Sequence, residues 1–414
     1  MKKVFFKTFG CRTNLYDSQV MMSALKDYEV TLDEGKADMV VVNSCTVTNG
    51  ADTHVRSYIS HVEKKSNAKI FLTGCGAHTK GESLLKSGRV HGVFGQSEKL
   101  KIDSFLSKEN SFYDAGDLNY VDKALVDDFA GKSRAFIKIQ EGCSFRCSYC
   151  IIPFVRGDAR SMDESRILEQ ITRLALNGFG EFILTGTNVG SYGQRTGSSV
   201  AKLMKKISLI RGVRRIRLGS VEPIQIDEEF KEILGESWLE KHLHVALQHT
   251  SPQMLKYMNR RNIYNQDKEL FEFLASKGLA IGTDFITGHP GESQELWKEA
   301  MQNISVLPLT HLHAFTYSKR DGTPSAMMKP EINARVAKER LHELKELVRS
   351  KNFDFRTAFN AELEVLIESQ KDGLFIGYDQ HFNKVVVESD EDLFGNWINI
   401  KDYEVKGDFN YAKY

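Results

Sequence analysis

The sequence of 414 residues contains no apolar run approaching the roughly 18 residues that a membrane-spanning helix needs. Its first apolar stretch, Val4–Phe6, ends at Lys7, so we expect no export signal there. Repeat arrays and low-complexity segments are also lacking, and a mean hydropathy of −0.36 leaves little room for extensive disorder. These features favour a folded cytoplasmic protein, and a chain of this length is expected to form two or three domains.

Cysteine is sparse, with six residues in the chain. Disulfide frameworks are typical of small secreted domains, so we do not expect these residues to pair with one another. They form two sets that lie far apart in the sequence: Cys11, Cys45 and Cys75, followed by Cys143, Cys147 and Cys150. The twelve histidines match neither the spacing of a zinc protease nor a nucleophilic triad. The cysteines are therefore the main candidates for chemistry.

Net charge is close to neutral, at +1, but positive and negative side chains are distributed unevenly. Residues 361–414 contain five Lys, no Arg and twelve Asp or Glu, which gives −7, whereas residues 1–360 have a net charge of +8. A mildly basic body is compatible with nucleic-acid binding, although net charge by itself is weak support. The acidic end would repel phosphate and would suit a basic protein partner, unless four of its lysines share one face: Lys371, Lys384, Lys401 and Lys406.

The first 120 residues alternate short apolar runs with helical patterns. The predicted strands are Lys3–Phe9, Met39–Asn43, Ile70–Thr73 and Gly92–Gly95, and the predicted helices are Ser18–Lys26, Asp52–Lys65 and Glu82–Ser87. Such alternation predicts a doubly wound parallel sheet, whose strands are apolar because both of its faces are buried. Residues 103–133 are polar and lack clear periodicity, and we expect a linker there.

A cysteine follows each of the first three predicted strands, at Cys11, Cys45 and Cys75. In a parallel sheet the carboxyl ends of all strands lie on one edge, where open α/β sheets bind ligands. The alternative is three unrelated buried thiols, since free cysteine is among the most buried residue types. Three cysteines in the same position after consecutive strands favour a shared metal ion or cluster.

A second β/α series follows. Its predicted strands are Ala135–Gln140, Glu181–Thr185, Arg215–Gly219, His244–Gln248, Ile281–Thr287 and His311–Tyr317, and helical patterns such as Ser161–Leu176 intervene. Six units are fewer than the eight of a closed barrel, so a partial, open (β/α)6 barrel is expected. Four histidines of this region are expected to be core or surface residues: His242, His244, His311 and His313. A basic cluster is expected either to contact phosphate or to form structural ion pairs: Arg211, Arg214, Arg215 and Arg217.

The spacing of apolar residues changes again after a long predicted helix over Ile332–Phe359. Four short strands then follow at intervals of about ten residues: Leu363–Glu368, Leu374–Tyr378, Asn383–Glu388 and Trp397–Lys401. This spacing predicts a small antiparallel β-barrel. The chain is thus expected to be an α/β multidomain protein with units at residues 1–120, 130–358 and 359–414.

The strongest signal is the segment from Cys143 to Cys150, which reads Cys-Ser-Phe-Arg-Cys-Ser-Tyr-Cys and follows the first strand of the second series. A structural zinc site usually takes four ligands in two separated pairs, whereas here three thiolates stand close together and no fourth cysteine remains. The spacing suits three corners of a cubane iron–sulfur cluster whose fourth iron has no protein ligand. An open iron of this kind can bind a small chelating molecule.

The segment from Cys143 to Cys150 resembles the cluster-binding loop of the radical S-adenosylmethionine (SAM) enzymes. In that superfamily the open iron is chelated by SAM, and one electron then cleaves the sulfonium to give a 5′-deoxyadenosyl radical. The surrounding Ile137–Gly157, together with Gly10–Ser18 and Asn43–Asn49, resembles one branch, the methylthiotransferases. The final β region is similar to the TRAM domain of that branch, an RNA- or protein-binding barrel.

This resemblance implies two [4Fe–4S] clusters, the radical SAM cluster on Cys143, Cys147 and Cys150 and an auxiliary cluster on the other three cysteines. It implies that a C–H bond is replaced with C–S–CH₃ at the expense of two SAM molecules, with flavodoxin or ferredoxin as the type of electron donor. It also implies SAM contacts at five residues: Tyr149, Gly186, Glu222, Gln248 and Gly288. Ordinary strand-end turn chemistry is the alternative for such positions, and it is the expectation for Asn188 and His249.

Three methylthiotransferase subfamilies compete, two that modify the tRNA adenosine 3′ of the anticodon (position 37) and one that modifies an Asp of a small-subunit ribosomal protein. Asn43–Asp52 and Arg214–Pro223 are most similar to the tRNA threonylcarbamoyl-adenosine methylthiotransferase subfamily. The isopentenyl-adenosine subfamily would differ around Cys45, and the ribosomal-protein subfamily would have Pro-Lys-Asn in place of Arg12–Asn14. We therefore expect a tRNA anticodon stem-loop as the partner and methylthiolation of C2 of N6-threonylcarbamoyladenosine as the reaction. The alternative from another functional class is a non-catalytic RNA-binding protein with structural zinc sites.

Overall fold

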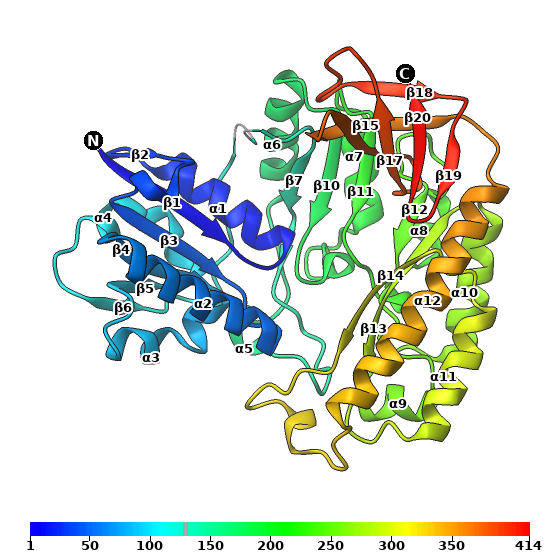
Figure 1. Cartoon of the computed structure of the whole chain (residues 1–414), viewed down its shortest axis with the longest axis horizontal. Coiled ribbons are helices and arrows are strands. Elements are labelled where there is room, and N and C mark those ends of the chain that lie inside the picture. Colours follow the sequence, from blue (N-terminus) through cyan, green and yellow to red (C-terminus); the bar gives the residue numbers. More distant parts are fainter. Residues whose placement is uncertain (127–128, 130) are drawn as a thin grey trace.

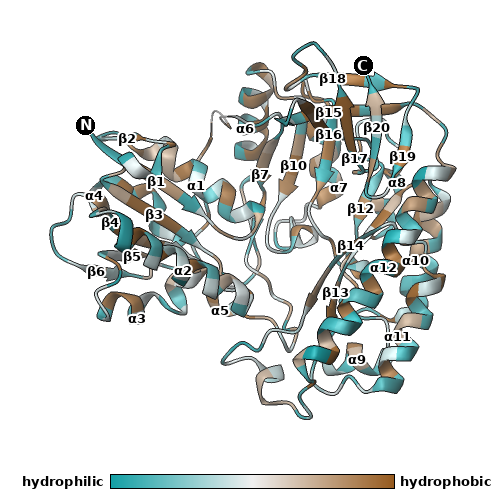
Figure 2. Ribbon diagram, viewed as in Figure 1, coloured by the Kyte–Doolittle hydropathy of each residue, from teal (hydrophilic) through white to brown (hydrophobic). Residues whose placement is uncertain are grey.

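The computed structural model describes residues 1–126, 129 and 131–414. Three parts follow one another along the chain (Figure 1): an amino-terminal sheet with its helices (blue to cyan), a central arc of strands and helices (green to yellow), and a carboxyl-terminal sheet (red) beside one end of the arc. Hydrophobic residues concentrate on the strands of the sheets, whereas the long helix α12 (Ala334–Ala358) carries many hydrophilic residues (Figure 2). In the described part of the chain, no helix combines the length and the apolar character needed to cross a lipid bilayer.

The amino-terminal sheet has helices on both of its faces. Its elements are β1 (Lys2–Thr8), α1 (Arg12–Ala24), β2 (Tyr28–Val30), β3 (Met39–Ser44), α2 (Asn49–Lys65), β4 (Lys69–Gly74), α3 (Gly81–Lys86), β5 (Gly92–Phe94), α4 (Ile102–Leu106) and β6 (Phe112–Asp114). All six strands are parallel, in the order β2-β1-β3-β4-β5-β6. Along β3, Val40 and Val42 pack with α2 and α3, whereas Met39 and Val41 pack with α1 and α4. The predicted doubly wound sheet is confirmed.

Two predictions for this region are wrong. Helix α1 begins at Arg12 rather than Ser18, because its buried face carries polar side chains such as Asn14 and Asp17 and therefore lacks apolar periodicity. Part of the predicted linker, residues 103–133, instead belongs to the sheet, since it contains most of α4 and the edge strand β6. Residues 127, 128 and 130 of that linker lie outside the described residues.

The central part is an arc of six parallel strands. Its elements are β7 (Ala135–Lys138), β8 (Gln140–Glu141), α5 (Ile152–Arg156), β9 (Arg160–Ser161), α6 (Glu164–Leu176), β10 (Glu181–Thr185), α7 (Val200–Ser208), β11 (Arg215–Leu218), α8 (Glu228–Glu232), β12 (His242–His244), α9 (Pro252–Tyr257), α10 (Tyr264–Ser276), β13 (Ala280–Thr287), α11 (Gln294–Val306), β14 (His311–Thr316) and α12. Strands β7, β10 and β11 form one sheet, and β12, β13 and β14 form another. Parallel bridges from Ile216 to Leu239 and from Val221 to Val245 continue the arc between them. The predicted partial (β/α)6 barrel is confirmed, although β12 starts before the predicted His244–Gln248.

The carboxyl-terminal sheet is mixed rather than wholly antiparallel. Its strands are β15 (Leu363–Lys371), β16 (Leu374–Tyr378), β17 (Lys384–Glu388), β18 (Trp397–Ile400), β19 (Glu404–Lys406) and β20 (Phe409–Lys413). The order is β18-β15-β16-β17-β20-β19, and β17 pairs with β20 in parallel. The four predicted strands are present in this curled sheet, which is consistent with a small barrel. The prediction missed β19 and β20, and the return of the chain through β20 accounts for the parallel pair.

Two residues of the basic cluster, Arg215 and Arg217, lie on β11 and form ion pairs, which is one of the two alternatives predicted for the cluster. Arg217 is buried and binds Glu181 and Glu240 at 2.8 and 2.6 Å. Arg215 binds Glu181 at 3.1 Å and, from the carboxyl-terminal sheet, Glu364 at 2.8 Å. These guanidinium groups therefore fix the carboxyl-terminal sheet to the barrel.

A buried charge network joins the amino-terminal domain to the barrel. Its members, here called the interface network, are Asp17, Lys99, Asp122, Lys138, Glu141 and Arg156. The Lys138 ammonium lies 2.6 Å from both Asp17 and Asp122 and is completely buried. Burial alone would raise the pKa of Asp17, but the neighbouring Lys138 and Lys99 outweigh it and hold this pKa well below its usual range. The network is stable only with all its charges present, since an unpaired buried charge is costly.

We expect Lys138→Met to lower the free energy of unfolding by about 3 to 5 kcal/mol, because it leaves Asp17 and Asp122 with an excess of buried negative charge. Denaturant unfolding followed by circular dichroism measures this loss. The matched control is Lys64→Met on the exposed face of α2, which should change stability by less than about 0.5 kcal/mol. Equal stability of the two variants would contradict the role of the network.

Candidate active site between two cysteine trios

The first three cysteines meet at the carboxyl edge of the amino-terminal sheet and are called the amino-terminal trio. Cys11 follows β1 and caps α1, Cys45 follows β3, and Cys75 follows β4 at the start of a short 3₁₀ helix. Glycine is required beside them: Gly10 has φ +92°, and a Cβ atom there would lie 2.6 Å from Cβ of Cys45. The predicted gathering of three strand-end cysteines agrees with this geometry.

The other three cysteines, called the loop trio, lie between β8 and α5. The amide of Cys143 donates to the carbonyl of Gly157 at 3.0 Å, and the amide of Cys150 donates to the carbonyl of Cys147 at 3.1 Å. Gly142 has φ +72°, and a Cβ atom there would lie 2.1 Å from the carbonyl oxygen of Asp158. The loop is thus a tight turn whose entry needs glycine and whose backbone is held against the start of β9.

Thiols within each trio influence one another. Burial is the main cause of a raised pKa, to about 11 for Cys45 and about 12 for Cys150, and neighbouring thiols of the same trio add to the effect. In the described residues, no three His, Cys, Asp or Glu side chains converge closely enough to hold a single metal ion. A cubane binds each thiolate at a separate iron and so fits this looser grouping, and binding would displace the thiol protons.

Each trio receives N–H donors at sulfur. Asn188 Nδ2 lies 3.5 Å from Cys143 Sγ, and Arg260 Nη1 lies 3.5 Å from Cys147 Sγ. At the amino-terminal trio, Arg156 Nε donates to Cys75 Sγ at 3.2 Å. Such donors favour the thiolate form and orient the side chain, as is typical of the surroundings of iron–sulfur sites.

Arg156 connects the two trios. It ends α5, which follows directly after the loop trio, yet its guanidinium reaches Cys75 of the amino-terminal trio. The same guanidinium binds Asp17 at 3.0 Å and also contacts Glu141 and the side-chain oxygen of Asn14. One buried side chain therefore fixes the two loops relative to each other.

Two of the predicted SAM contacts lie beside the loop trio. Tyr149 packs with Met254, Met258 and Ile286 in a small apolar cluster. The Glu222 carboxylate forms a two-pronged pair with Arg260, with one arm at 3.0 Å, and the same Arg260 arm reaches Cys147. The structure thus brings Tyr149 and Glu222 to one side of the loop.

The other three predicted contacts are more spread out. At Gly186 a Cβ atom would lie 2.7 Å from the carbonyl oxygen of Gln140, so this residue must be small beside β8. Gln248 has φ +67° and pairs through its backbone with β13. The amide of Gly288 donates to Glu292 at 2.8 Å, and its Cα faces Ala337 of α12. His249 is fully buried and accepts a local backbone hydrogen bond from Ser251, which agrees with the structural role predicted for it.

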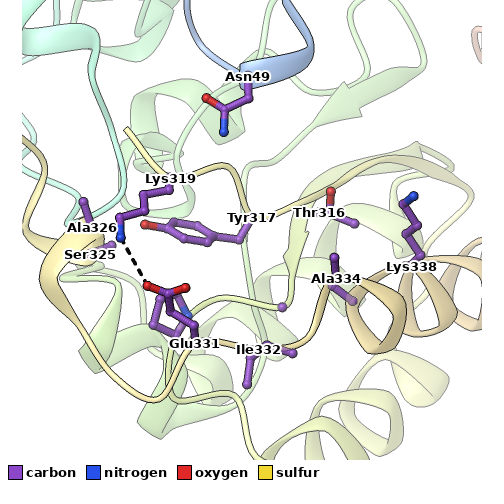
Figure 3. A pocket seen from close by; sticks show the side chains of 13 residues that line it. Asn49, Thr316, Tyr317, Lys319, Ser325, Ala326, Glu331, Ile332, Ala334 and Lys338 are labelled. Atoms are coloured by element: carbon purple, nitrogen blue, oxygen red, sulfur yellow. Dashed lines mark hydrogen bonds and ion pairs between the residues drawn. The ribbon is translucent and has the colours of Figure 1, made fainter. Parts of the chain in front are cut away.

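A pocket of about 220 Å³ lies between the end of β14, the start of α12 and Asn49 at the head of α2 (Figure 3). Tyr317 lines the pocket, and Lys319 pairs with Glu331 at 3.1 Å along one wall. Ser325 in the same wall hydrogen-bonds Ser148, which follows Cys147 in the loop, at 2.8 Å through their side chains. The pocket therefore borders the site rather than lying apart from it.

Three residues of this site have no assigned role in the sequence interpretation. Arg156 falls inside the segment that resembles the methylthiotransferases, but no pattern shows that it turns toward Cys75. Arg260 is distant from both trios in the sequence and gives no local signal. Asn188 was expected to have a turn role only, whereas its side chain contacts Cys143. All three depend on tertiary packing.

Family models match two segments of the chain. Residues 3–95 match the uncharacterized protein family UPF0004, which covers most of the amino-terminal sheet and its cysteine trio. Residues 137–304 match the radical SAM superfamily, which covers the loop trio and the barrel up to α11. The two matches coincide with the two halves of the site.

Relatives align along nearly the whole chain. A Helicobacter pylori (strain J99) protein provisionally named a methylthiotransferase is 51% identical over 100% of both chains. The threonylcarbamoyladenosine tRNA methylthiotransferase MtaB of Bacillus subtilis is 32% identical over 97% of this chain and 94% of its own. The tRNA-2-methylthio-N(6)-dimethylallyladenosine synthase of Wolinella succinogenes is 35% identical over 83% of this chain and 82% of its own.

Among solved structures, the radical SAM methyltransferase TsrM of Kitasatospora setae has a similar fold, with a TM-score of 0.62 over 79% of this chain and 77% of that chain at 16% identity. The superfamily match lies on the segment that holds the loop trio, and the amino-terminal match lies on the other trio. Together with 32% identity over 97% of this chain to the Bacillus subtilis methylthiotransferase, these matches show that the chain belongs to the radical SAM methylthiotransferases, which are enzymes that use SAM and iron–sulfur clusters.

Proposed function

We propose that this enzyme methylthiolates tRNA, converting C2 of N6-threonylcarbamoyladenosine at position 37 into its 2-methylthio derivative. The observation that carries the proposal is the alignment of 97% of this chain with the Bacillus subtilis enzyme named for that substrate. The local phrases Asn43–Asp52 and Arg214–Pro223 favour the same subfamily. The proposed partner is the anticodon stem-loop, and flavodoxin or ferredoxin is the proposed type of electron donor.

In this proposal the loop trio holds one [4Fe–4S] cluster and the amino-terminal trio holds the auxiliary one, each with one open iron. When bound, these clusters supply the electron that splits SAM and the sulfur that replaces hydrogen at C2. Tyr149, Gly186, Glu222, Gln248 and Gly288 are the proposed SAM contacts. Tyr149 and Glu222 lie nearest the loop trio, although the Glu222 carboxylate is paired with Arg260 and the amide of Gly288 is bound by Glu292.

The chain's own residues set the surroundings of the two clusters. Asn188 and Arg260 donate N–H groups to sulfurs of the loop trio, and Arg156 does so at Cys75. Such hydrogen bonds hold the thiolates in orientation and tune the reduction potential of the cluster. The three parts at residues 1–120, 130–358 and 359–414 are proposed to carry the auxiliary cluster, the SAM chemistry and the TRAM-like substrate contact.

The isopentenyl-adenosine subfamily is the second candidate, because the Wolinella succinogenes relative named for a dimethylallyl substrate is 35% identical over 83% of this chain. The two candidates act on the same tRNA position, so they differ only in the N6 substituent that the site accepts. An Asp of a ribosomal protein is a third candidate, which the acidic carboxyl-terminal sheet would suit.

Mass spectrometry of nucleosides from a strain lacking this gene tests the substrate. We expect N6-threonylcarbamoyladenosine to accumulate without its 2-methylthio derivative, because no other step then inserts sulfur at C2. Isopentenyl derivatives should be unchanged, and they serve as the internal control. Loss of the 2-methylthio isopentenyl derivative instead would move the enzyme to the second subfamily.

Replacing each trio by alanine tests the division of labour. The triple variant of Cys143, Cys147 and Cys150 should form no 5′-deoxyadenosine, whereas the triple variant of the amino-terminal trio should still form it and yield no methylthio product. The 5′-deoxyadenosine and the methylthio product are both measured by chromatography of reactions with the anaerobically reconstituted enzyme. The brown colour of this enzyme should bleach with dithionite. Zinc at both trios, or loss of both activities in the second variant, would contradict the assignment.

Arg156→Lys keeps the positive charge but removes the planar fork that reaches Cys75 and the interface network together. We expect methylthio product per 5′-deoxyadenosine to fall on the order of tenfold, the usual effect of losing a hydrogen-bond donor next to a metal ligand. Arg160→Lys is the matched control, since the Arg160 hydrogen bonds go to backbone carbonyls of Tyr120, Arg156 and Asp158, its ion pair with Glu141 is long at 3.9 Å, and no contact in the described structure joins it to Cys75. An unchanged ratio in Arg156→Lys would show that Arg156 has a purely structural role.

A further inference from the structure

The inner face of β12, β13 and β14 is lined by imidazoles. His242 and His244 on β12, Asp284 on β13, and His311 and His313 on β14 alternate with residues that pack outward. The outward residues include Leu243, Ile281 and Phe285, which belong to the main core with the helices that cover this half of the barrel. The imidazoles therefore face the hollow of the arc, on the side of the amino-terminal domain.

The carboxylate on this face already has its partners. Asp284 lies 3.1 Å from His313, 3.3 Å from His244 and 3.2 Å from the Ser220 hydroxyl. Deeper in the hollow, burial lowers the pKa of His242 and His311, so both imidazoles are neutral near pH 7. Glu240 lies 3.8 Å from His242 but is already paired with Arg217 at 2.6 Å, so the described carboxylates at this face are engaged by other side chains.

Three guanidinium groups surround Phe382, which projects from the turn between β16 and β17 against this end of the barrel. Their carbons lie 5.9 Å (Arg12), 5.6 Å (Arg134) and 5.0 Å (Arg217) from the centre of the ring. The His242 ring is 5.3 Å from the same centre, so Arg12 lies beside the imidazole face. Arg12 reaches this place from the first position of α1, directly after Cys11.

Unlike Arg134 and Arg217, Arg12 is not paired with a carboxylate in the part of the chain that the structure describes. Arg217 is paired with Glu181 and Glu240, and Arg134 lies 2.8 Å from Glu368. Within residues 1–126, 129 and 131–414, no carboxylate oxygen lies within 4.0 Å of the Arg12 guanidinium, and it makes no hydrogen bond. The Arg12 guanidinium thus lies against Phe382 beside two paired guanidinium groups and has no carboxylate of its own among these residues.

We propose that Arg12 recognises the substrate by binding the carboxylate of its N6 substituent, with the planar fork of the guanidinium pairing both carboxylate oxygens. This inference rests on the proposed function, in which the substituent is a threonylcarbamoyl group that ends in a carboxylate. Such a two-pronged pair between guanidinium and carboxylate is among the strongest hydrogen-bonded contacts in proteins. An uncharged dimethylallyl group would leave Arg12 unpaired in a partly desolvated site, so the same residue would select against it.

A phosphate of the RNA shares the anionic chemistry of this carboxylate, and three stem-loops that differ only at position 37 separate the two. They carry N6-threonylcarbamoyladenosine, its methyl ester, or unmodified adenosine. Dissociation constants are measured by fluorescence anisotropy with the reconstituted enzyme under anaerobic conditions. The variants are Arg12→Gln, Arg12→Lys and, as a matched control, Arg211→Gln, which removes an exposed guanidinium.

We expect the wild-type enzyme to bind the acid on the order of tenfold more tightly than the ester or the unmodified stem-loop. Arg12→Gln should abolish this preference, Arg12→Lys should keep part of it, and Arg211→Gln should keep all of it. If Arg12→Gln weakened the binding of all three stem-loops equally, Arg12 would contact an RNA phosphate rather than the carboxylate, and the proposal would be overturned. An Arg12→Gln variant that retains the full preference for the acid would overturn it as well.

Two further measurements keep the test decisive. The iron content of the Arg12→Gln variant shows whether the neighbouring Cys11 still supports its cluster. If the cluster is lost, the Arg12→Lys variant and the wild-type comparison of acid with ester are used in place of Arg12→Gln. A wild-type enzyme without preference for the acid overturns the proposal by itself. Failure of the proposed function is a distinct result, namely methylthio product from the dimethylallyl stem-loop and none from the acid.

Discussion

Six buried charges set the position of the amino-terminal domain on the barrel, and the arrangement of both cysteine trios depends on them. The network is neutral, because three cations face three anions: Lys99, Lys138 and Arg156 against Asp17, Asp122 and Glu141. A low local dielectric strengthens each of these pairs and makes any orphaned member costly. Since Asp17 lies on the helix that starts after Cys11, and Arg156 follows the loop trio, the network fixes the geometry between the two trios.

The structural elements that could be predicted from the sequence are those whose pattern lies within the element itself. The apolar strand Met39–Asn43 and the tight spacing of Cys143–Cys150 indicate a buried strand and a cluster loop without knowledge of the remaining chain. The start of α1 could not be predicted in the same way, because its buried face is polar and is satisfied by residues of the barrel, such as Gln170 for Tyr16. The same limit applies to Arg156 and Arg260, whose partners lie far away in the sequence.

The candidate site contains both residues that could be predicted from the sequence and residues that could not. Spacing predicts the six cysteines as ligands, and the sheet topology brings the amino-terminal three together. The groups that donate hydrogen bonds to the cysteines come from distant parts of the chain: Arg156 of the barrel reaches Cys75 of the amino-terminal trio, and Asn188 and Arg260 reach the loop trio from later parts of the barrel. No single segment of sequence therefore displays the complete site.

The docking of the acidic carboxyl-terminal sheet limits how far the enzyme can be taken apart. Glu364 and Glu368 neutralise Arg215 and Arg134 at the barrel end, and Trp397 stacks on Arg214 and Arg215. A truncated chain ending near residue 358 would leave Arg215 and Arg134 with Glu181 as their remaining carboxylate and would expose this basic end of the barrel. The barrel therefore depends on the last segment of the chain, and Glu364 and Glu368 of that segment serve internal contacts rather than contact with an outside molecule.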